Sequence, residues 1–356
     1  MDIEDLLRTT VDRRASDLHI RAGGPPYMRI DGDLFPVDSP PMSAADTERL
    51  AFGMMSEKQA REFQATNECD FAHAIQGLSR FRVNVFRQRG SVGMAFRRVL
   101  PGGSSFEALC LPPAVRHLAD EARGLVLVTG VTGSGKTTTT AAMIHHINMT
   151  RRCHIVTIED PIEVLHSDRM AIIDQREVGI DTNDFHSALK RMLRQDPDVI
   201  FIGEMRDVET VRAALQAADS GHLVISTLHT LNATETVNRI IDFFPDHQQM
   251  QARLSLAGTL RGIVSQRLLL RTDGKGRVPA VEVLISNGRI FEMITNPEHT
   301  HLIKDVISEG DFYGMQTFDQ HLMALFKEGT ITLEEAMTAA TNSHDLTVAL
   351  RQAGIA

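Results

Sequence analysis

The chain has 356 residues, of which 42% are hydrophobic and 23% are charged, and its formal net charge is −9. This length allows two domains with separate cores, and the composition is that of an ordinary globular protein. The negative charge argues against bulk nucleic-acid binding, and no apolar run approaches the roughly 20 residues of a membrane helix. Three scattered cysteines argue against a disulfide framework or a four-cysteine zinc site.

Residues 1–99 are predicted to form a small α+β domain. In its first helix, apolar residues recur at helical spacing and form one face. Ser56 is followed three residues later by Gln59, the signature of a capping box. The expected elements are a helix at residues 2–14, strands at 17–21, 27–30 and 34–37 with a turn at Asp31, Gly32 and Asp33, and helices after Ser43 and Ser56.

A second β region carries most arginines of this domain. In residues 80–87, Phe81, Val83 and Val85 alternate with polar side chains, so one face is predicted to be buried and the other to carry cations. Residues 93–99 look like the neighbouring strand. The arginines gathered there are Arg80, Arg82, Arg87, Arg89, Arg97 and Arg98. A solvated sheet face commonly explains such a cluster, whereas beside a nucleotide site guanidinium groups suit the γ-phosphate.

Residues 100–110 are predicted to be a linker, because they are rich in turn-forming residues and lack periodicity. Residues 111–356 are expected to form an α/β domain with a mostly parallel sheet, since strands and helices alternate. The predicted strands are 125–129, 154–158, 199–203 and 223–227, and the helices between them are 137–148, 184–194 and 207–218. Beyond residue 232 the pattern is mainly helical, at 232–241, 247–270, 300–309, 319–328 and 332–339, with one strand at 278–285.

The most specific motif is GxxxxGK[ST] at residues 130–137, a P-loop between an apolar strand and a helical stretch. Its glycines let backbone N–H groups turn towards an anion, and the helix start adds unpaired donors and the positive end of its dipole. Lys136 is expected to reach the β- and γ-phosphates of ATP, and the Thr137 hydroxyl to hold Mg²⁺. The predicted nucleotide-binding residues are Gly130, Thr132, Gly133, Ser134, Gly135, Lys136, Thr137 and Thr138.

Hydrolysis of ATP needs carboxylates near Mg²⁺ and a group that polarises the attacking water. Two acidic strand ends are expected to supply them from strands beside the P-loop strand. Residues 157–163 end with Glu163, and residues 198–204 end with Gly203 and Glu204, so Glu204 takes the place of the usual acid directly after the strand. A solvated strand end is the ordinary explanation for a lone acid, but two such ends in one P-loop domain favour function.

Two histidines, His222 and His229, flank the apolar strand at residues 223–227. At about 3.3 Å per residue they lie about 23 Å apart, which argues against a shared metal ion. At least one of them suits a sensor of the γ-phosphate, although a lone histidine is more often a structural residue.

These motifs together resemble those of the secretion-superfamily ATPases. The matching segments are the P-loop, an Asp box at residues 157–163, an atypical Walker B ending at 203–207, a His box at 221–230, and the stretches 16–19, 175–178, 193–198 and 313–319. The resemblance covers nearly the whole chain and is nearest to the type IV pilus retraction subfamily. Pilus-assembly and type II secretion ATPases resemble this core, but they carry a longer N-terminal region and often a four-cysteine zinc loop where this chain has a short turn.

The resemblance implies a homohexameric ring in which a PAS-like N-terminal domain precedes a RecA-like ATPase domain. It makes Glu163 the catalytic glutamate, and Glu204 an acid acting on Mg²⁺ or water. His222 and His229 would sense the nucleotide or brace a subunit contact. Arg82 and Arg97 would close over the γ-phosphate, with Arg80 and Arg98 as alternatives because a one-residue slip of register exchanges the faces.

The resemblance also implies partners and a location. Each N-terminal domain would pack on the ATPase domain of the next subunit, with the linker as a hinge. The implied partners are an inner-membrane pilus platform protein and a sister retraction ATPase, and no nucleic acid is expected. The acidic start of the chain lacks the features of a signal peptide, so we expect a cytoplasmic protein that is peripheral at the inner membrane.

One segment departs from the retraction subfamily. Its Ala-Ile-Arg motif, associated with coupling hydrolysis to retraction, is missing where this chain has residues 286–293. An accessory retraction ATPase and an assembly or secretion ATPase therefore stay open as alternatives. A nucleic-acid motor and a scaffold with little turnover are further alternatives; the negative charge argues against the first, and the intact Glu163 and Glu204 against the second.

Overall fold

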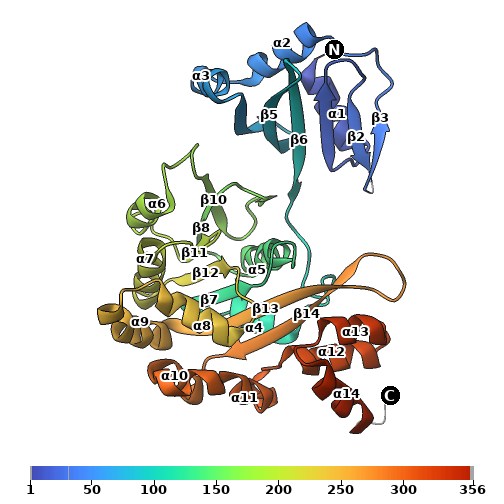
Figure 1. Cartoon of the computed structure of the whole chain (residues 1–356). Helices are drawn as coiled ribbons and strands as arrows, with labels where there is room; N and C mark the ends of the chain where they lie inside the picture. Colours follow the sequence, from blue (N-terminus) through green and yellow to red (C-terminus); the bar gives the residue numbers. More distant parts are fainter. Residues whose placement is uncertain (1, 31, 353–356) are drawn as a thin grey trace. The chain divides into compact units, whose positions relative to one another are not determined.

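The computed structural model describes residues 2–30 and 32–352, and the chain forms two compact units. Unit 1 comprises Met1–Pro101 and Glu163–Leu165, and unit 2 comprises Gly102–Ile162 and His166–Ala356. The chain therefore returns to unit 1 for three residues in the middle of unit 2. Figure 1 shows the elements of both units.

Unit 1 is an antiparallel sheet covered by helices. Its strands lie in the order β3-β2-β1-β6-β5-β4, and a short strand, β9, pairs in parallel with β6. Leu7, Leu50 and Phe63 from three helices pack against alternate side chains of the strands and form one core. The bounds are α1 Ile3–Asp12, β1 Asp17–Arg21, β2 Tyr27–Ile30, β3 Asp33–Pro36, α2 Ala44–Met54, α3 Glu57–Thr66, β4 Glu68–Ile75, β5 Ser79–Gln88, β6 Ser91–Pro101 and β9 Val164–Leu165.

The helices and strands predicted for this unit are confirmed within two or three residues, but β4 was missed. Buried and exposed residues alternate only in its first half, through Cys69 and Phe71. This alternating stretch is too short to identify a strand from sequence. Ser56 caps α3 in a capping box with Gln59, as predicted. The predicted turn includes Asp31, which lies outside the described residues.

Unit 2 is built on a second sheet with the strand order β10-β8-β11-β12-β7-β13-β14. Every neighbouring pair is parallel except β13 and β14. The bounds are β7 Gly124–Thr129, β8 His154–Glu159, β10 Ile172–Glu177, β11 Val199–Ile202, β12 Leu223–Leu228, β13 Leu260–Leu270 and β14 Arg277–Ile285. The central strands are buried along their whole length, because helices cover both faces of a parallel sheet.

The helices of unit 2 divide between the two faces of this sheet. In β7, Leu125 and Leu127 pack in a core cluster with α6 to α9, whereas Val126 and Val128 pack in a second cluster with α4 and α5. The last three helices pack on the ends of β13 and β14 (Figure 1). The bounds are α4 Pro113–Ala119, α5 Lys136–Thr150, α6 Phe185–Met192, α7 Val208–Asp219, α8 Ala233–Asp242, α9 Asp246–Thr259, α10 Gly288–Thr295, α11 Ile303–Ser308, α12 Phe318–Lys327, α13 Leu333–Ala339 and α14 Ser343–Gln352.

The helix predicted at residues 247–270 is wrong in its second half. Helix α9 ends at Thr259, and Leu260–Leu270 is strand β13 between β7 and β14. An apolar run that is buried on both faces of a sheet cannot be told from a buried helix by periodicity alone. The sequence analysis also missed β10, α4, α10 and α14.

Strand β6 continues to Pro101 and so includes the first two residues of the predicted linker, whereas α4 begins at Pro113, after the end of that linker. Residues 102–105 carry no helix or strand.

Candidate functional site

The P-loop connects β7 to α5, and three of its glycines have positive φ values of 143° at Gly130, 80° at Gly133 and 94° at Gly135. A Cβ atom on Gly130 would lie 2.5 Å from the carbonyl oxygen of Gln266, so the loop packs directly on the backbone of β13. The first N–H groups of α5 have no helical acceptors. A helix start after a glycine turn is the arrangement that binds phosphate.

The polar side chains of the loop fit a phosphate chain. Lys136 is buried, and its Nζ donates to the carbonyl oxygens of Gly130 at 2.7 Å and Val131 at 3.0 Å. The Ser134 hydroxyl is buried without a hydrogen-bond partner, whereas Thr137 and Thr138 are exposed at the start of α5. An ammonium group, a buried hydroxyl and exposed hydroxyls around a glycine turn are groups that nucleotide phosphates and Mg²⁺ would use.

Glu204 follows β11, and its carboxylate contacts the side chains of Arg206 and His229. Its Oε1 lies 2.5 Å from Arg206 Nη2, and its Oε2 lies 3.4 Å from His229 Nε2. Its carboxylate raises the pKa of the Arg206 guanidinium through a hydrogen bond and charge attraction. The structure therefore brings Glu204 and His229 together, and it adds Arg206, to which the sequence analysis gave no role.

The glycine that displaces the usual acid has a packing explanation. The Gly203 N–H donates to the carbonyl oxygen of Ile158 at 2.8 Å, and its own carbonyl accepts from the Thr227 hydroxyl at 2.6 Å. A Cβ atom at this position would lie 3.3 Å from the Ile158 oxygen. A side chain directly after β11 would therefore need the backbone of β8 to shift by a few tenths of an ångström, so this position favours glycine, and Glu204 is the next residue along the chain.

The two histidines lie at opposite ends of β12. His222 precedes the strand, and its Nδ1 lies 2.9 Å from the carbonyl oxygen of Ala217 and 3.0 Å from the Ser220 hydroxyl, at the end of α7. His229 follows the strand and contacts Glu204. The structure therefore does not bring His222 to the end of the sheet where the P-loop and Glu204 lie.

The acidic strand ends are not on strands beside the P-loop strand, which corrects that expectation. The neighbours of β7 are β12 and β13, so β11 is the second strand from β7 and β8 is the third. The carboxyl ends of parallel strands nevertheless meet at one edge of a sheet, where ligands of open α/β folds bind.

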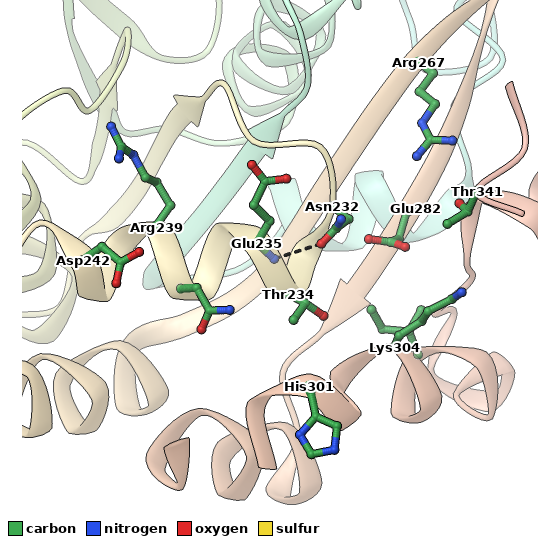
Figure 2. A pocket seen from close by; sticks show the side chains of 12 residues that line it. Asn232, Thr234, Glu235, Arg239, Asp242, Arg267, Glu282, His301, Lys304 and Thr341 are labelled. Atoms are coloured by element: carbon green, nitrogen blue, oxygen red, sulfur yellow. Dashed lines mark hydrogen bonds between the residues drawn. The ribbon is translucent and has the colours of Figure 1, made fainter. Parts of the chain in front are cut away.

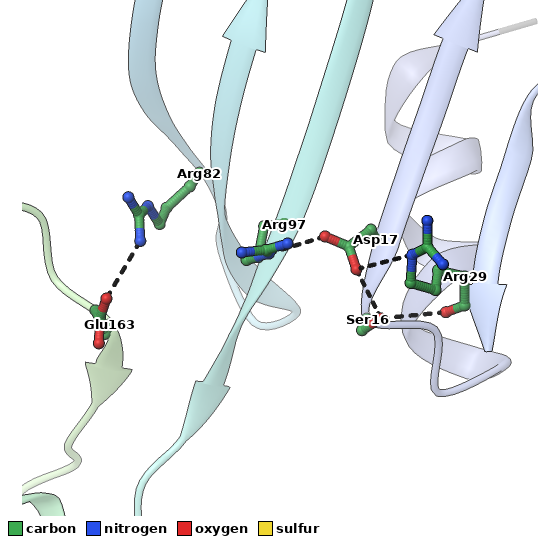
Figure 3. Close-up of polar contacts among 6 residues, drawn as sticks. All are labelled: Ser16, Asp17, Arg29, Arg82, Arg97 and Glu163. Atoms are coloured by element: carbon green, nitrogen blue, oxygen red, sulfur yellow. Dashed lines mark hydrogen bonds and ion pairs between the residues drawn. The ribbon is translucent and has the colours of Figure 1, made fainter. Parts of the chain in front are cut away.

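Unit 1 contains a second group of predicted site residues (Figure 3). Arg82 on β5 lies opposite Arg97 on β6, and the Arg82 Nη1 is 3.4 Å from Oε1 of Glu163. The Arg97 Nε donates to Oδ1 of Asp17 at 2.9 Å, and the Ser16 hydroxyl donates to Oδ2 at 2.7 Å. Burial favours the neutral acid, but these two hydrogen bonds hold the pKa of Asp17 below its usual value.

Three further polar residues, one within the Asp box and two on the neighbouring strand β10, were not predicted as site residues. Glu159 is buried and accepts from the Thr157 hydroxyl at 2.7 Å and from Gln175 Nε2 at 3.1 Å. Glu177 is buried, and its Oε2 accepts from the N–H of Ile162 at 3.0 Å. Gln175 and Glu177 lie on β10, in which two isoleucines are followed by four polar residues, so the sequence has no alternation that would have predicted a strand.

A pocket with a volume of about 710 Å³ lies elsewhere in unit 2 (Figure 2). Glu282 is buried at this pocket, accepts from the N–H of Ala233 at 2.8 Å, and has a pKa raised by burial. The pocket is lined by Asn232, Thr234, Glu235, Asn238, Arg239, Asp242, Arg267, Glu282, His301, Lys304, Ile307 and Thr341. None of the predicted phosphate-binding or catalytic residues, all within the described part of the chain, is among them.

Comparison with known proteins identifies close relatives over nearly the whole chain. The Pseudomonas aeruginosa protein named type IV pilus ATPase PilU is 43% identical over 351 residues, 99% of this chain and 92% of that protein. The type IV pilus retraction ATPase PilT of the same organism is 42% identical over 340 residues, covering 96% and 98%. A twitching motility protein of Neisseria gonorrhoeae is 42% identical over 344 residues, covering 97% and 92%.

Solved structures agree with the fold. A crystal structure of the pilus retraction motor PilT with bound ADP has a TM-score of 0.89 and 46% identity, and the match covers 98% of this chain and 99% of that one. The Legionella pneumophila ATPase DotB, at 23% identity and a TM-score of 0.81, shares the fold. The predicted order of an α+β N-terminal domain and a RecA-like P-loop domain is confirmed by these matches.

None of the helices within residues 2–30 and 32–352 has the length and hydrophobicity needed to cross a bilayer. The family described as type II/IV secretion system protein matches residues 1–337. With this match, the relatives above and the P-loop in place, the chain belongs to the type II/IV secretion ATPase family and is an ATPase of the PilT type.

Proposed function

We propose that this chain is a hexameric motor that hydrolyses Mg-ATP to retract type IV pili. The observation that carries the proposal is a complete P-loop cradle in a chain that matches an ADP-bound retraction motor along 98% of its length. The proposed domains are residues 1–99, a linker at 100–110 and an ATPase domain at 111–356. Each cycle of hydrolysis would move one domain against the other and against the next subunit.

The proposed roles of the residues follow from their chemistry. Lys136 and the P-loop N–H groups would hold the phosphates, and Thr137 and Glu204 would hold Mg²⁺, which would supply positive charge against the transferring phosphoryl group. Glu163 orients and deprotonates the attacking water. The Arg82 and Arg97 guanidinium groups stabilise negative charge that develops on the γ-phosphate.

The histidines have different proposed roles, because they lie at different ends of β12. His229 lies 3.4 Å from Glu204 and would relay the state of the nucleotide through that carboxylate. His222 stands at the other end of the strand and would brace a contact between subunits. The proposed partners are the other subunits of the hexamer, a platform protein at the cytoplasmic face of the inner membrane and a sister retraction ATPase, without nucleic acid.

Turnover and mass together test the enzymatic part of the proposal. Purified protein should have the mass of a hexamer by light scattering and should hydrolyse ATP. Lys136→Ala and Glu163→Gln should each lower kcat by at least about 100-fold, because they remove phosphate binding and the water-activating group. A monomer without turnover would contradict an autonomous motor.

An accessory retraction ATPase is the second candidate. Two observations keep it open: the relative named PilU is as similar as PilT, and the Ala-Ile-Arg motif is missing at residues 286–293. Expression in a piliated strain that lacks both retraction ATPases separates the candidates. An autonomous retraction motor restores twitching and lowers the number of surface pili. If twitching returns only when a sister retraction ATPase is expressed together with this chain, the result supports the accessory role. An increase in the number of surface pili supports a role in assembly.

A further inference from the structure

Glu163 lies in a short excursion of the chain. Residues Glu163–Leu165 belong to unit 1, although the chain before and after them belongs to unit 2. The excursion begins directly at the proposed catalytic glutamate. Its position therefore makes Glu163 part of a unit other than the one that contains the P-loop.

Unit 2 holds the chain on both sides of this excursion. The N–H of Ile162, which is buried, donates to Glu177 Oε2 at 3.0 Å. The N–H of His166 donates to Gln175 Oε1 at 2.8 Å. Gln175 and Glu177 are two residues apart on β10, so their side chains point to the same face of the strand. These bonds fix where the chain leaves unit 2 and where it re-enters.

Unit 1 holds the excursion itself. Strand β9 pairs in parallel with the end of β6, with Val164 opposite Leu100 and Leu165 opposite Pro101. The Glu163 carboxylate lies 3.4 Å from Arg82 Nη1 on β5, the strand beside β6 (Figure 3). Backbone pairing and a side-chain ion pair therefore both tie Glu163 to the sheet of unit 1.

We propose that β9 is a positioning strand that makes the catalytic glutamate move with unit 1. Motion of unit 1 then carries Glu163 with it, whereas the phosphates stay with the P-loop of unit 2. A general base must stand within hydrogen-bond reach of the water that it activates, and a displacement of 1 Å can cost about 100-fold in rate. Hydrolysis would thus depend on the position of unit 1 in each subunit. This inference rests on the proposed role of Glu163.

The first test removes the pairing without changing any proposed catalytic residue. Pro101 has no N–H, so the N–H of Leu165 is a donor that the pairing of β9 with β6 needs. Leu165→Pro removes it and keeps Val164 in an extended conformation, whereas Leu165→Ala truncates the same side chain and keeps the N–H. Leu165→Pro should lower kcat at least about 10-fold relative to Leu165→Ala. KM and the affinity for ADP, measured by calorimetry, should stay within about twofold.

A second test locks the strand instead of releasing it. Leu100→Cys with Val164→Cys, in a background with Cys69, Cys110 and Cys153 replaced by alanine, places two thiols on register partners. Neighbouring strands lie about 4.8 Å apart, within the range of a disulfide. The crosslink should form to the same extent without nucleotide and with ADP, and the oxidised full-length protein should keep the turnover of its reduced form.

The outcomes are distinguishable from failure of the proposed function. The role of β9 is overturned if Leu165→Pro and Leu165→Ala have equal kcat. It is also overturned if oxidation of the double-cysteine protein abolishes turnover and a reductant restores that turnover. If Leu165→Pro changes KM or fails to fold, the disulfide decides. Full turnover of Glu163→Gln would instead overturn the catalytic role of Glu163. The pairing of β9 with β6 would then position no catalytic residue.

Discussion

Gly130 and Gly203 occupy two positions where the backbone lies close to another strand, and the approach is much closer at Gly130. At Gly130 a Cβ atom would meet the Gln266 carbonyl oxygen at 2.5 Å, and the φ of 143° is strained for any other residue. At Gly203 the obstacle is the Ile158 carbonyl oxygen at 3.3 Å. Both obstacles are backbone atoms of neighbouring strands, so they cannot move aside as a flexible side chain could.

Gly130→Ala should therefore destabilise the protein more than the same change at Gly133. At Gly133 no atom lies within 4 Å of the added Cβ, and only its positive φ opposes the substitution, at about 1–2 kcal/mol. At Gly130 the clash adds roughly 1–3 kcal/mol. Urea denaturation without nucleotide measures the difference, and equal free energies of unfolding in the two variants would contradict the close approach to β13.

Arg82→Ala should abolish most hydrolysis and keep much of the affinity for nucleotide. Its guanidinium group is proposed to act chiefly on transition-state charge, so kcat should fall roughly 100-fold while KM changes little. Arg61→Ala is the matched control, because Arg61 is exposed on α3 and pairs only with Glu57 among the contacts described for it. Wild-type turnover of Arg82→Ala would remove Arg82 from the site.

At the scale of elements, β13 and β14 join the P-loop strand to the C-terminal helices. Strand β13 pairs with β7, and β14 pairs with β13 and packs against α12. His321 on α12 is half-buried against this sheet, and its Nδ1 accepts from the N–H of Val281 at 2.9 Å. Burial lowers the pKa of His321 from 6.5 to about 4. The seam between α12 and the sheet thus requires a neutral imidazole.

This seam should lose stability as the pH falls from about 6.5 to about 4. In that range the unfolded chain binds a proton at His321 that the folded chain excludes, so the loss reaches about 3 kcal/mol when complete. His321→Asn keeps an acceptor for Val281 and cannot titrate, so its thermal stability should depend less on pH in this window. His344→Asn, at an exposed histidine on α14, should leave the dependence unchanged. Identical pH profiles for the wild type and both variants would contradict a neutral His321 in the folded chain.

At the scale of the whole molecule, the proposed catalytic residues are divided between two units. Lys136, Glu204 and His229 belong to unit 2, whereas Arg82, Arg97 and Glu163 belong to unit 1. In a ring, such a division allows unit 1 of one subunit to complete the site of another. Hydrolysis would then require an assembled ring as well as an intact chain.

Mixing two inactive variants tests this arrangement. Arg97→Ala removes a side chain of unit 1 that is proposed to contact the γ-phosphate. Lys136→Ala removes the side chain of unit 2 that is proposed to bind the phosphates. Each variant alone should show at most about 1% of wild-type turnover. Co-assembled rings should regain measurable turnover at interfaces where the intact Lys136 of one subunit meets the intact Arg97 of another. Mixed hexamers without any recovery would show that each site is formed within one chain.

Much of the local structure was predictable from sequence. The P-loop motif, the capping box at Ser56 and the apolar strands of unit 2 each depend on residues close together in the chain. The residue pairs of the candidate site were not predictable in the same way. Arg82 with Glu163, Arg97 with Asp17, and Glu204 with His229 join positions on or directly beside different strands, so their distances depend on strand order and register.

The sequence by itself determined that this chain has an α+β domain, a parallel α/β domain and a phosphate-binding loop, because these follow from local periodicity and from a contiguous motif. Only the tertiary structure decided that Leu260–Leu270 is a strand beside the P-loop strand, that β12 separates Glu204 from that strand, and that Glu163 belongs to unit 1. Each of these depends on contacts between segments far apart in the chain. Such contacts decide whether an apolar run becomes a helix or a strand, and which unit holds a short segment.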